Sequence, residues 1–457
     1  MQAWRNQIRA FYNDRLCAIL MTALVLIGYV TKTEIVFFTI MTAFVLVGGF
    51  VASDARFALM PFLITVFFVT VEHTPGVPTH STYYASATIL PFLIALFLVF
   101  FGALAVFAFR NRKRANSFSC KGIFETLALW CISLCIGGAF NAAYTASNFF
   151  YALTFPLALL IPYLFFALFV RFDREALDYF MLCLVLAGGL IVLQFFSLLW
   201  SGEIPLSENG SISKEHIMLG WAVHNSFAGL LTTLIPPCFY FAAVHKHGAV
   251  FYLVGVIEFF AVLLSQSRAA TLVGGLILLF CVALSCLFGC NRRKNRQLTL
   301  LLCILLFLLA IPLWGRIQAL LSNFINVGLD DNGRLELWKN GFDQFFAHPV
   351  FGAGFYDHGI TAEEVLNWEI NVYPYFYHNT VVQMLASAGL VGCASYLYHR
   401  YCTLRLFLVR PNLEKSFLAL GILAMVLFCM LDVLFFITYP LIYYAFMLLF
   451  AQKSEEI

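Results

Sequence analysis

Residues Val250–Gly289 read "VFYLVGVIEFFAVLLSQSRAATLVGGLILLFCVALSCLFG", two apolar runs joined by the polar stretch Ser265–Arg268. The runs have the composition of helices that cross a hydrocarbon core about 30 Å thick. An arginine near such a depth costs at least roughly 2.5–3.5 kcal/mol on insertion scales, so Arg268 is a candidate functional residue. The stretch therefore predicts two membrane helices with a cation kept at their junction.

The whole chain shares this apolar character. Of its 457 residues, 62% are hydrophobic and 11% are charged, whereas soluble domains are roughly 45–50% apolar and 25% charged. We predict an all-α polytopic integral membrane protein with about 12–14 transmembrane helices, forming a single membrane domain over residues 1–457. The apolar stretches that predict the helices are Leu16–Val30, Thr33–Ala52, Ala55–Val71, Tyr83–Phe109, Ile123–Tyr144, Phe149–Val170, Ala176–Trp200, Ile217–Ala243, Val250–Leu264, Ala269–Gly289, Leu298–Trp314, Tyr377–Tyr398, Ser416–Leu431 and Leu434–Ala451.

The distribution of cations predicts the orientation. If both termini are cytoplasmic, all but six of the 27 Lys and Arg residues lie inside, which satisfies the positive-inside rule. The six on the outer side are Lys32, Lys214, Arg268, Arg316, Arg334 and Lys339. The net charge of +3 is then a topological signal and does not indicate nucleic-acid binding.

One long interruption, residues 315–376, falls on the outer side. Within it, "DDNGRLELWKNGFDQFF" (Asp330–Phe346) places large apolar side chains at helical spacing. This pattern predicts an amphipathic helix on the outer leaflet, with Asp331 and Asn332 as capping candidates. The following "AHPVFGAGF" predicts a tight turn through Gly352 and Gly354.

Three features on the outer side suggest one chemistry. Arg268 and Arg334 offer planar, bidentate donors that suit a diphosphate, and the first turn of the predicted surface helix favours an anion as well. His378, next to Asn379, supplies a base with a pKa near 6.5. Together they indicate transfer of a group from a lipid diphosphate to an alcohol. We expect no metal and no cofactor, because the outer histidines lack the spacing of a ligand set and no nucleotide-binding motif is present.

Each feature also has a simpler explanation. Arg268 can extend to the interface and bind lipid phosphate, and Arg334 can pair with a carboxylate such as Asp330 or Glu336. His378 can belong to an interfacial aromatic belt. The combined interpretation is favoured because all three features require the same face of the membrane.

These residues resemble the O-antigen ligase and polysaccharide polymerase superfamily of bacterial membrane glycosyltransferases. "SQSRAA" (Ser265–Ala270) is similar to a Ser-Arg-Gly/Ala segment of that family, and "GRLELWKNGFDQFFAHPVFGAGF" (Gly333–Phe355) to its Arg…Trp…Pro-x-x-Gly-x-Gly stretch. "HNTVVQMLASAGLVG" (His378–Gly392) fits its His-Asn…Gly-x-x-Gly pattern, and "WAVHNSFAGLL" (Trp221–Leu231) resembles its Asn-x-x-Ala segment, with His224 in place of the usual proline.

The resemblance implies a metal-independent, inverting glycosyltransferase of the large all-helical membrane type, acting on a polyprenyl-diphosphate-linked oligosaccharide. Arg268 and Arg334 would bind the diphosphate, and His378 would orient or deprotonate the acceptor hydroxyl. Asn379 and the turn through Gly352 and Gly354 would shape the site. The motif that includes His224 and Asn225 adds these two residues as candidate substrate contacts.

The alternatives differ in acceptor or in class. A polymerase would move a growing glycan onto the next lipid-linked unit, whereas a ligase would move the finished glycan to a lipid, wall or protein acceptor. A polysaccharide or lipid transporter, or flippase, would instead use ionisable groups near mid-membrane, for which Glu258 and Asp432 are the acidic candidates. We favour the polymerase, in a bacterial cytoplasmic (inner) membrane, with the bilayer, an acceptor glycan and a chain-length regulator or flippase as partners.

Overall fold

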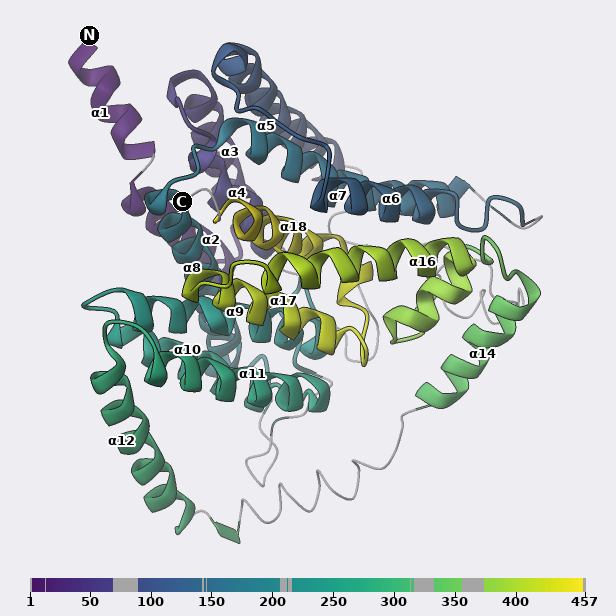
Figure 1. Ribbon diagram of the computed structural model, residues 1–457. Coiled ribbons are helices and arrows are strands. Elements are labelled where there is room, and N and C mark those ends of the chain that lie inside the picture. The colour runs from purple at the N-terminus through teal and green to yellow at the C-terminus, as the bar shows by residue number, and fades with distance from the viewer. Residues whose placement is uncertain are drawn as a thin grey trace.

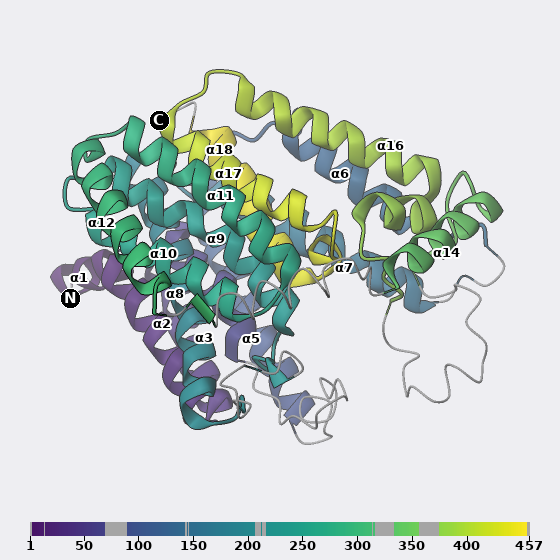
Figure 2. The same cartoon turned by 90° about the horizontal axis from the view of Figure 1, so that it is seen from below.

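The chain folds into a helical bundle. The computed structural model describes residues 2–12, 14–68, 89–141, 144, 146–205, 212, 216–312, 314–315, 333–355 and 374–454 (Figures 1 and 2). No β-strand occurs in these residues, which confirms the all-α prediction. The α-helices are α1 (Gln2–Tyr12), α2 (Arg15–Val30), α3 (Glu34–Val51), α4 (Leu59–Ile64), α5 (Ile89–Asn111), α6 (Ile123–Cys135), α7 (Ala146–Phe169), α8 (Arg174–Ser201), α9 (His224–Val244), α10 (Ala249–Leu264), α11 (Arg268–Leu287), α12 (Arg292–Ala310), α14 (Arg334–Ala347), α16 (Thr380–Leu408), α17 (Leu413–Phe428) and α18 (Thr438–Lys453). Short 3-10 helices are η1 (Ala55–Ala58), η2 (Thr65–Phe68), η3 (Arg112–Arg114) and η5 (Leu434–Phe436).

Seven of the described helices have the length and composition to cross a membrane, so the protein is a multi-pass membrane protein. They lie in α3, α5, α7, α8, α9, α11 and α16. Shorter apolar helices accompany them, and some predicted spans are divided. The predicted span Ala55–Val71 is split into η1, α4 and η2 as far as Phe68, while the predicted span Ile123–Tyr144 ends as α6 at Cys135, before the left-handed Gly138.

Helix α9 forms the centre of the bundle. It packs against α8, α10, α11 and α17, and 94% of the residues in its most apolar stretch are buried. Glycine permits the close approach of α17, because a Cβ on Gly229 would lie 2.5 Å from the Phe428 ring. Helix α12, which follows α11, has a largely exposed apolar surface. This surface includes Leu300, Leu306 and Phe307, as expected of a helix that faces lipid.

Helix α16 is bent back on itself at Gly389. This residue has φ 64° and ψ −157°, a conformation that breaks the helix into a first limb, residues 380–388, and a second limb, residues 390–408. Trp130 Nε1 lies 3.3 Å from Met384 Sδ in the first limb, and the Trp130 ring lies 5.5 Å from the Tyr396 ring in the second limb. In a straight helix Met384 and Tyr396 would be about 18 Å apart. The two limbs therefore lie close to each other (Figures 1 and 2). The bend turns the N-terminus of α16 into the bundle.

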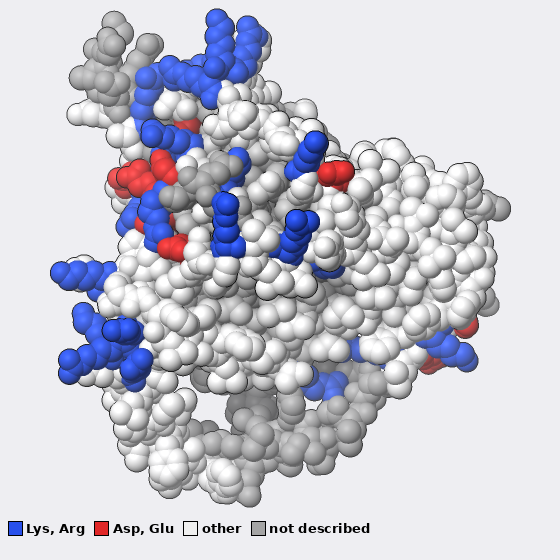
Figure 3. Space-filling view, viewed as in Figure 1, with Lys and Arg blue, Asp and Glu red and all other residues white. Residues whose placement is uncertain are grey.

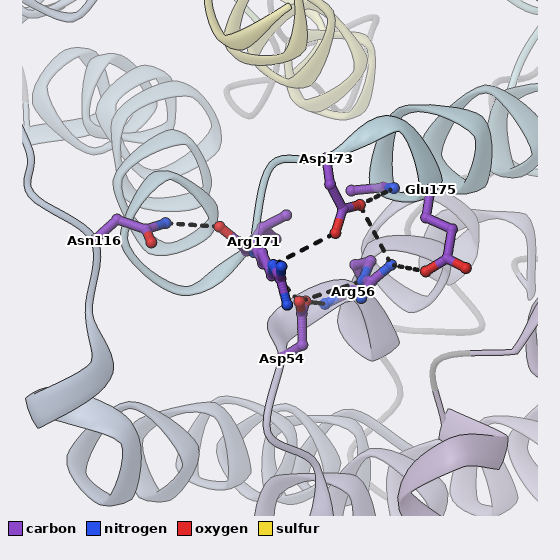
Figure 4. Close-up of polar contacts among 8 residues, drawn as sticks. Asp54, Arg56, Asn116, Arg171, Asp173 and Glu175 are labelled. Atoms are coloured by element: carbon purple, nitrogen blue, oxygen red, sulfur yellow. Dashed lines mark hydrogen bonds and ion pairs between the residues drawn. The ribbon is translucent and has the colours of Figure 1, made fainter. Parts of the chain in front are cut away.

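Charged side chains gather mainly over one end of the molecule (Figure 3). In η1, Arg56 pairs with the capping residue Asp54 (Nε to Oδ2, 3.3 Å), and it reaches the α7–α8 connection through Asp173 (Nη1 to Oδ1, 3.9 Å), as Figure 4 shows. Burial raises the pKa of Asp54, an effect that Arg56 and a hydrogen bond from the Arg171 backbone N–H oppose. The network holds the η1 end of the bundle together, away from the predicted site.

Candidate functional site

Arg268 lies at the start of a helix, as predicted. Helix α10 ends at Leu264, and Gln266 adopts the left-handed φ of 59° that turns the chain into α11. Ser267 caps α11 by accepting a hydrogen bond from the Ala270 N–H (3.5 Å). Arg268 is therefore the first residue of α11 and is partly exposed, a position where the helix dipole and free N–H groups favour an anion.

The N-termini of α9 and α11 lie at the same end of the bundle. A Cβ on Gly274 of α11 would lie 2.9 Å from Thr232 of α9, so the two helices are in close contact through their N-terminal halves. His224 is the first residue of α9 and Asn225 the second, and both are half-buried. This end therefore brings His224 and Asn225 toward the side of the bundle where Arg268 lies.

The predicted amphipathic helix is present as α14. It begins after Gly333, which takes a left-handed φ of 73°; the predicted capping residues Asp331 and Asn332 lie outside the described residues. The helix packs against the bundle, because Trp338 contacts a small cluster formed by Tyr377, Val382 and Ala386 at the first limb of α16. This contact places Arg334, the first residue of α14, next to the N-terminus of α16.

His378, Asp432 and Arg334 meet at this point. His378 Nδ1 lies 3.2 Å from Asp432 Oδ1, and Arg334 Nη2 lies 4.0 Å from Asp432 Oδ2. The Asp432 side chain is only 5% exposed, whereas those of His378 and Arg334 are 36% and 27% exposed. Asp432 is thus the buried member of the group, and the histidine and the arginine form its open side.

The carboxylate of Asp432 is only partly satisfied. Oδ1 accepts a hydrogen bond from the Val433 N–H (2.9 Å) and faces the His378 ring, while Oδ2 has no hydrogen bond within the described part of the chain. A buried carboxylate is costly unless it is paired. The imidazole and the guanidinium are therefore the groups that stabilise its charge.

His378 has a strained backbone. Its φ of 51° lies in the left-handed region, which a residue with a side chain rarely adopts. Such conformations are retained where surrounding contacts impose them, often at functional sites. Here Asn379 imposes the turn, because its Oδ1 accepts from the Val381 and Val382 N–H groups and its Nδ2 donates to Met430 O (3.0 Å).

Asn379 and Thr380 also fix the segment that carries Asp432. The Thr380 N–H and hydroxyl both donate to Cys429 O at 2.9 Å. These bonds and the Asn379–Met430 bond join the first turn of α16 to the chain two and three residues before Asp432. Because Phe428 packs on Gly229 of α9, the same end of the bundle holds the starts of α9, α11 and α16.

Gly352 and Gly354 lie against the break in α16. The Ala353 and Gly354 N–H groups donate to Ala386 O and Ser387 O, at 2.7 and 3.0 Å, while Leu390 N–H donates to Pro349 O (2.8 Å). Both glycines have a left-handed φ, and a Cβ on Gly352 would collide with the Ser387 backbone. The structure thus places them in contact with α16 and shows them supporting the fold of the site.

Asp432 is the site residue that sequence reasoning assigned to a different role. It was an acidic candidate for the transporter alternative, because it lies between the last two predicted spans and no motif includes it. The available signal was its position: an acidic residue between two apolar segments that predict adjacent helices. The pairing with His378 depends on the bend in α16, which the sequence pattern did not predict.

Comparison with known protein families agrees with the predicted resemblance. Residues 253–397 match the family model described as O-antigen ligase, a range that includes Arg268, Arg334, Gly352, Gly354, His378 and Asn379. His224, Asn225 and Asp432 lie outside it. No curated protein matches the chain. The match over residues 253–397, about a third of an all-α multi-pass membrane protein, supports the resemblance to the O-antigen ligase and polymerase superfamily.

Proposed function

We propose that the protein is a surface-polysaccharide polymerase that transfers a polyprenyl-diphosphate-linked glycan onto the hydroxyl of an acceptor sugar, at the outer face of a bacterial cytoplasmic membrane. The observation that carries this proposal is the 3.2 Å contact between His378 and Asp432, with Arg334 on the other carboxylate oxygen. The family match supports a function of the ligase and polymerase type.

In the proposed reaction, His378 acts as the base. Asp432 accepts the Nδ1–H, which leaves the Nε2 lone pair to accept a proton from the acceptor hydroxyl. The acceptor oxygen forms a bond with the anomeric carbon, and the bond from that carbon to the diphosphate oxygen breaks. The lipid diphosphate leaves with the electron pair, the imidazole holds the proton, and the anomeric configuration is inverted.

The two arginines would bind the diphosphate. The 4.0 Å distance between Arg334 and Asp432 is longer than a hydrogen bond, so the five donors of this guanidinium remain suited to phosphate oxygens. Arg268 would add a second permanent positive charge at the start of α11. Because two arginines stabilise the leaving group, the proposed transfer needs no metal, and we expect it to continue in a chelator.

The remaining site residues have supporting parts in the proposal. Asn379 holds the turn at His378, and Gly352 and Gly354 hold the break in α16, so these residues would shape the site. His224 and Asn225, at the start of α9, would contact the glycan. Both termini would be cytoplasmic, and a flippase or a chain-length regulator would act with the protein.

Analysis of lipid-linked glycans tests the proposal. Cells with and without the gene, and cells carrying Arg268→Ala, are compared by mass spectrometry of their polyprenyl-linked glycans. A polymerase predicts that single repeat units accumulate when the protein is absent or inactive. Long chains retained on the lipid would instead show a ligase, and an unchanged lipid-linked pool would reject glycosyl transfer in favour of transport.

A further inference from the structure

The guanidinium of Arg400 lies inside a cage of aromatic rings. Arg400 is on the second limb of α16, and its Cζ lies 4.7 Å from the Tyr396 ring centroid, 4.6 Å from Phe435, 4.9 Å from Tyr444 and 5.6 Å from Trp130. These rings belong to α16, η5, α18 and α6. One cation therefore joins four elements, of which α6 lies far from the other three in the sequence.

No carboxylate pairs with this cation within the described residues. The Nε, Nη1 and Nη2 atoms of Arg400 are all buried, and the polar side chain that interacts with the guanidinium in this cage is the neutral phenol of Tyr444. A buried, unpaired cation would be strongly unfavourable in an apolar environment, and ring faces within about 6 Å offset part of this cost through cation–π attraction. The contact is specific to a cation, because a neutral apolar side chain would lose this attraction.

The cage holds the segment that carries Asp432. Phe435 lies three residues after Asp432, and its ring also packs edge-on against Trp130 (5.9 Å) and Tyr444 (5.1 Å). At the other end of the segment, Cys429 O accepts hydrogen bonds from Thr380. Asp432 is thus fixed between the start of α16 on one side and the Arg400 cage on the other.

The charge of Arg400 also acts on this region. The Cys429 thiol is close enough to both Asp432 and Arg400 for each charge to act on it. Within the described residues, the charged and titratable groups that interact with Asp432 include Arg334 of α14, Cys429 beside α17 and Tyr439 of α18, with Arg400 of α16 beyond Cys429. Arg334 is partly exposed to solvent, whereas the nitrogens of Arg400 are buried, so the charge of Arg400 is the less screened of the two.

We propose that Arg400 is a positioning residue for glycosyl transfer, which fixes the turn bearing Asp432 through its aromatic cage and supplies a buried positive charge next to that turn. This inference rests on the proposed function for its effect on transfer. Its effect on the His378–Asp432 pair does not require that function.

The test compares Arg400→Met, which removes the charge, with Arg400→Lys, which keeps it. Arg405→Met, on the exposed face of the same helix, is the matched control. We expect Arg400→Met to lower the transfer rate at saturating donor by at least tenfold with donor affinity unchanged. Loss of a positive charge raises the pKa of every neighbouring acid, so the acid limb of the rate profile moves to higher pH by about 0.5–1 unit.

A second readout needs no transfer activity. Diethyl pyrocarbonate modifies neutral imidazole, so the pH dependence of His378 modification, followed by mass spectrometry of the purified full-length protein in detergent, reports the pKa of His378. We expect its midpoint to rise in Arg400→Met and to stay in place in Arg400→Lys and Arg405→Met. Phe435→Leu, which keeps the charge and opens the cage, should lower transfer and leave the midpoint in place.

The outcomes separate the two proposals. If Arg400→Met matches Arg405→Met in both transfer and the His378 midpoint, Arg400 has no positioning role. If the unaltered protein transfers no glycan but the midpoint moves as expected, the proposed function fails while the coupling of Arg400 to the pair stands. If Arg400→Met does not fold, a fall in transfer in Phe435→Leu with donor affinity retained supports the role of the cage, and normal transfer in that variant overturns it.

Discussion

Nδ1 of His378 lies 3.2 Å from Oδ1 of Asp432, a residue 54 positions further along the chain. In the proposed reaction, this contact leaves Nε2 of His378 to accept the proton of the acceptor hydroxyl. His378→Gln should therefore lower transfer by about 10²–10⁴-fold, the usual contribution of general base catalysis. Donor binding should persist, because the proposed diphosphate contacts are arginines. The measurement is glycan transfer and lipid-donor binding by protein in nanodiscs.

A histidine at the end of α14 provides the control. His348 ends α14, and it makes a backbone hydrogen bond to Gln344 O, so His348→Gln should leave transfer within twofold. Equal losses in His378→Gln and His348→Gln would mean that replacing any histidine in this region, and not the loss of a base, reduces activity.

Asp432→Asn should also abolish most of the transfer, because the amide cannot stabilise the imidazolium that forms when His378 takes a proton. Since the two residues act as one unit, the double variant His378→Gln/Asp432→Asn should be little slower than His378→Gln alone. Multiplicative losses would show that the two side chains act independently. Asp343→Asn, on the exposed surface of α14, controls for the loss of a carboxylate.

The arginines should affect donor affinity as well as rate. Arg334→Ala and Arg268→Ala each remove donors proposed to bind diphosphate, so each should raise KM for the lipid donor by about tenfold or more, as expected for a charge-assisted hydrogen bond worth roughly 1.5–3 kcal/mol. Lys339→Ala, on the exposed face of α14, should change KM less than threefold. A normal KM in both arginine variants would exclude them as diphosphate ligands.

Gly389 should be intolerant of any side chain. Its φ of 64° and ψ of −157° disfavour an L residue, and a Cβ would collide with Val350 O. Gly389→Ala should destabilise the fold by about 1–3 kcal/mol, measured as a lower midpoint of thermal unfolding in detergent. Gly102→Ala is the control: no atom lies within 4 Å of a Cβ there, and alanine in a helix should be neutral or stabilising. Equal midpoints for the two variants would contradict the strained geometry.

The sequence predicted much of the architecture because hydropathy and helical periodicity are local properties. The membrane class, the start of a helix at Arg268 and the amphipathic helix at Arg334 all follow from patterns within about twenty residues. The packing of α14 on α16 through Trp338 did not follow, because an exposed apolar face has the same pattern whether lipid or protein covers it.

The partner of His378 could not be predicted in the same way. Asp432 approaches His378 only because α16 folds back at Gly389 and its first turn is bound to Cys429 and Met430. A single glycine within an apolar run does not reveal such a bend. The sequence-based roles of Arg268, Arg334 and His378 remain predictions, and the contacts of Asp432 add the residue that those predictions lacked.

The bend at Gly389 limits how this protein can be recombined with its relatives. The backbone of residues 349–354 completes hydrogen bonds that α16 cannot make across its own break, so this segment and the helix form one structural unit. A chimera that exchanges residues 315–376 alone would separate the two halves of that unit. Exchanges whose boundaries fall before α14 and after α16 would preserve it. This segment is therefore the one to exchange as a whole in a chimera.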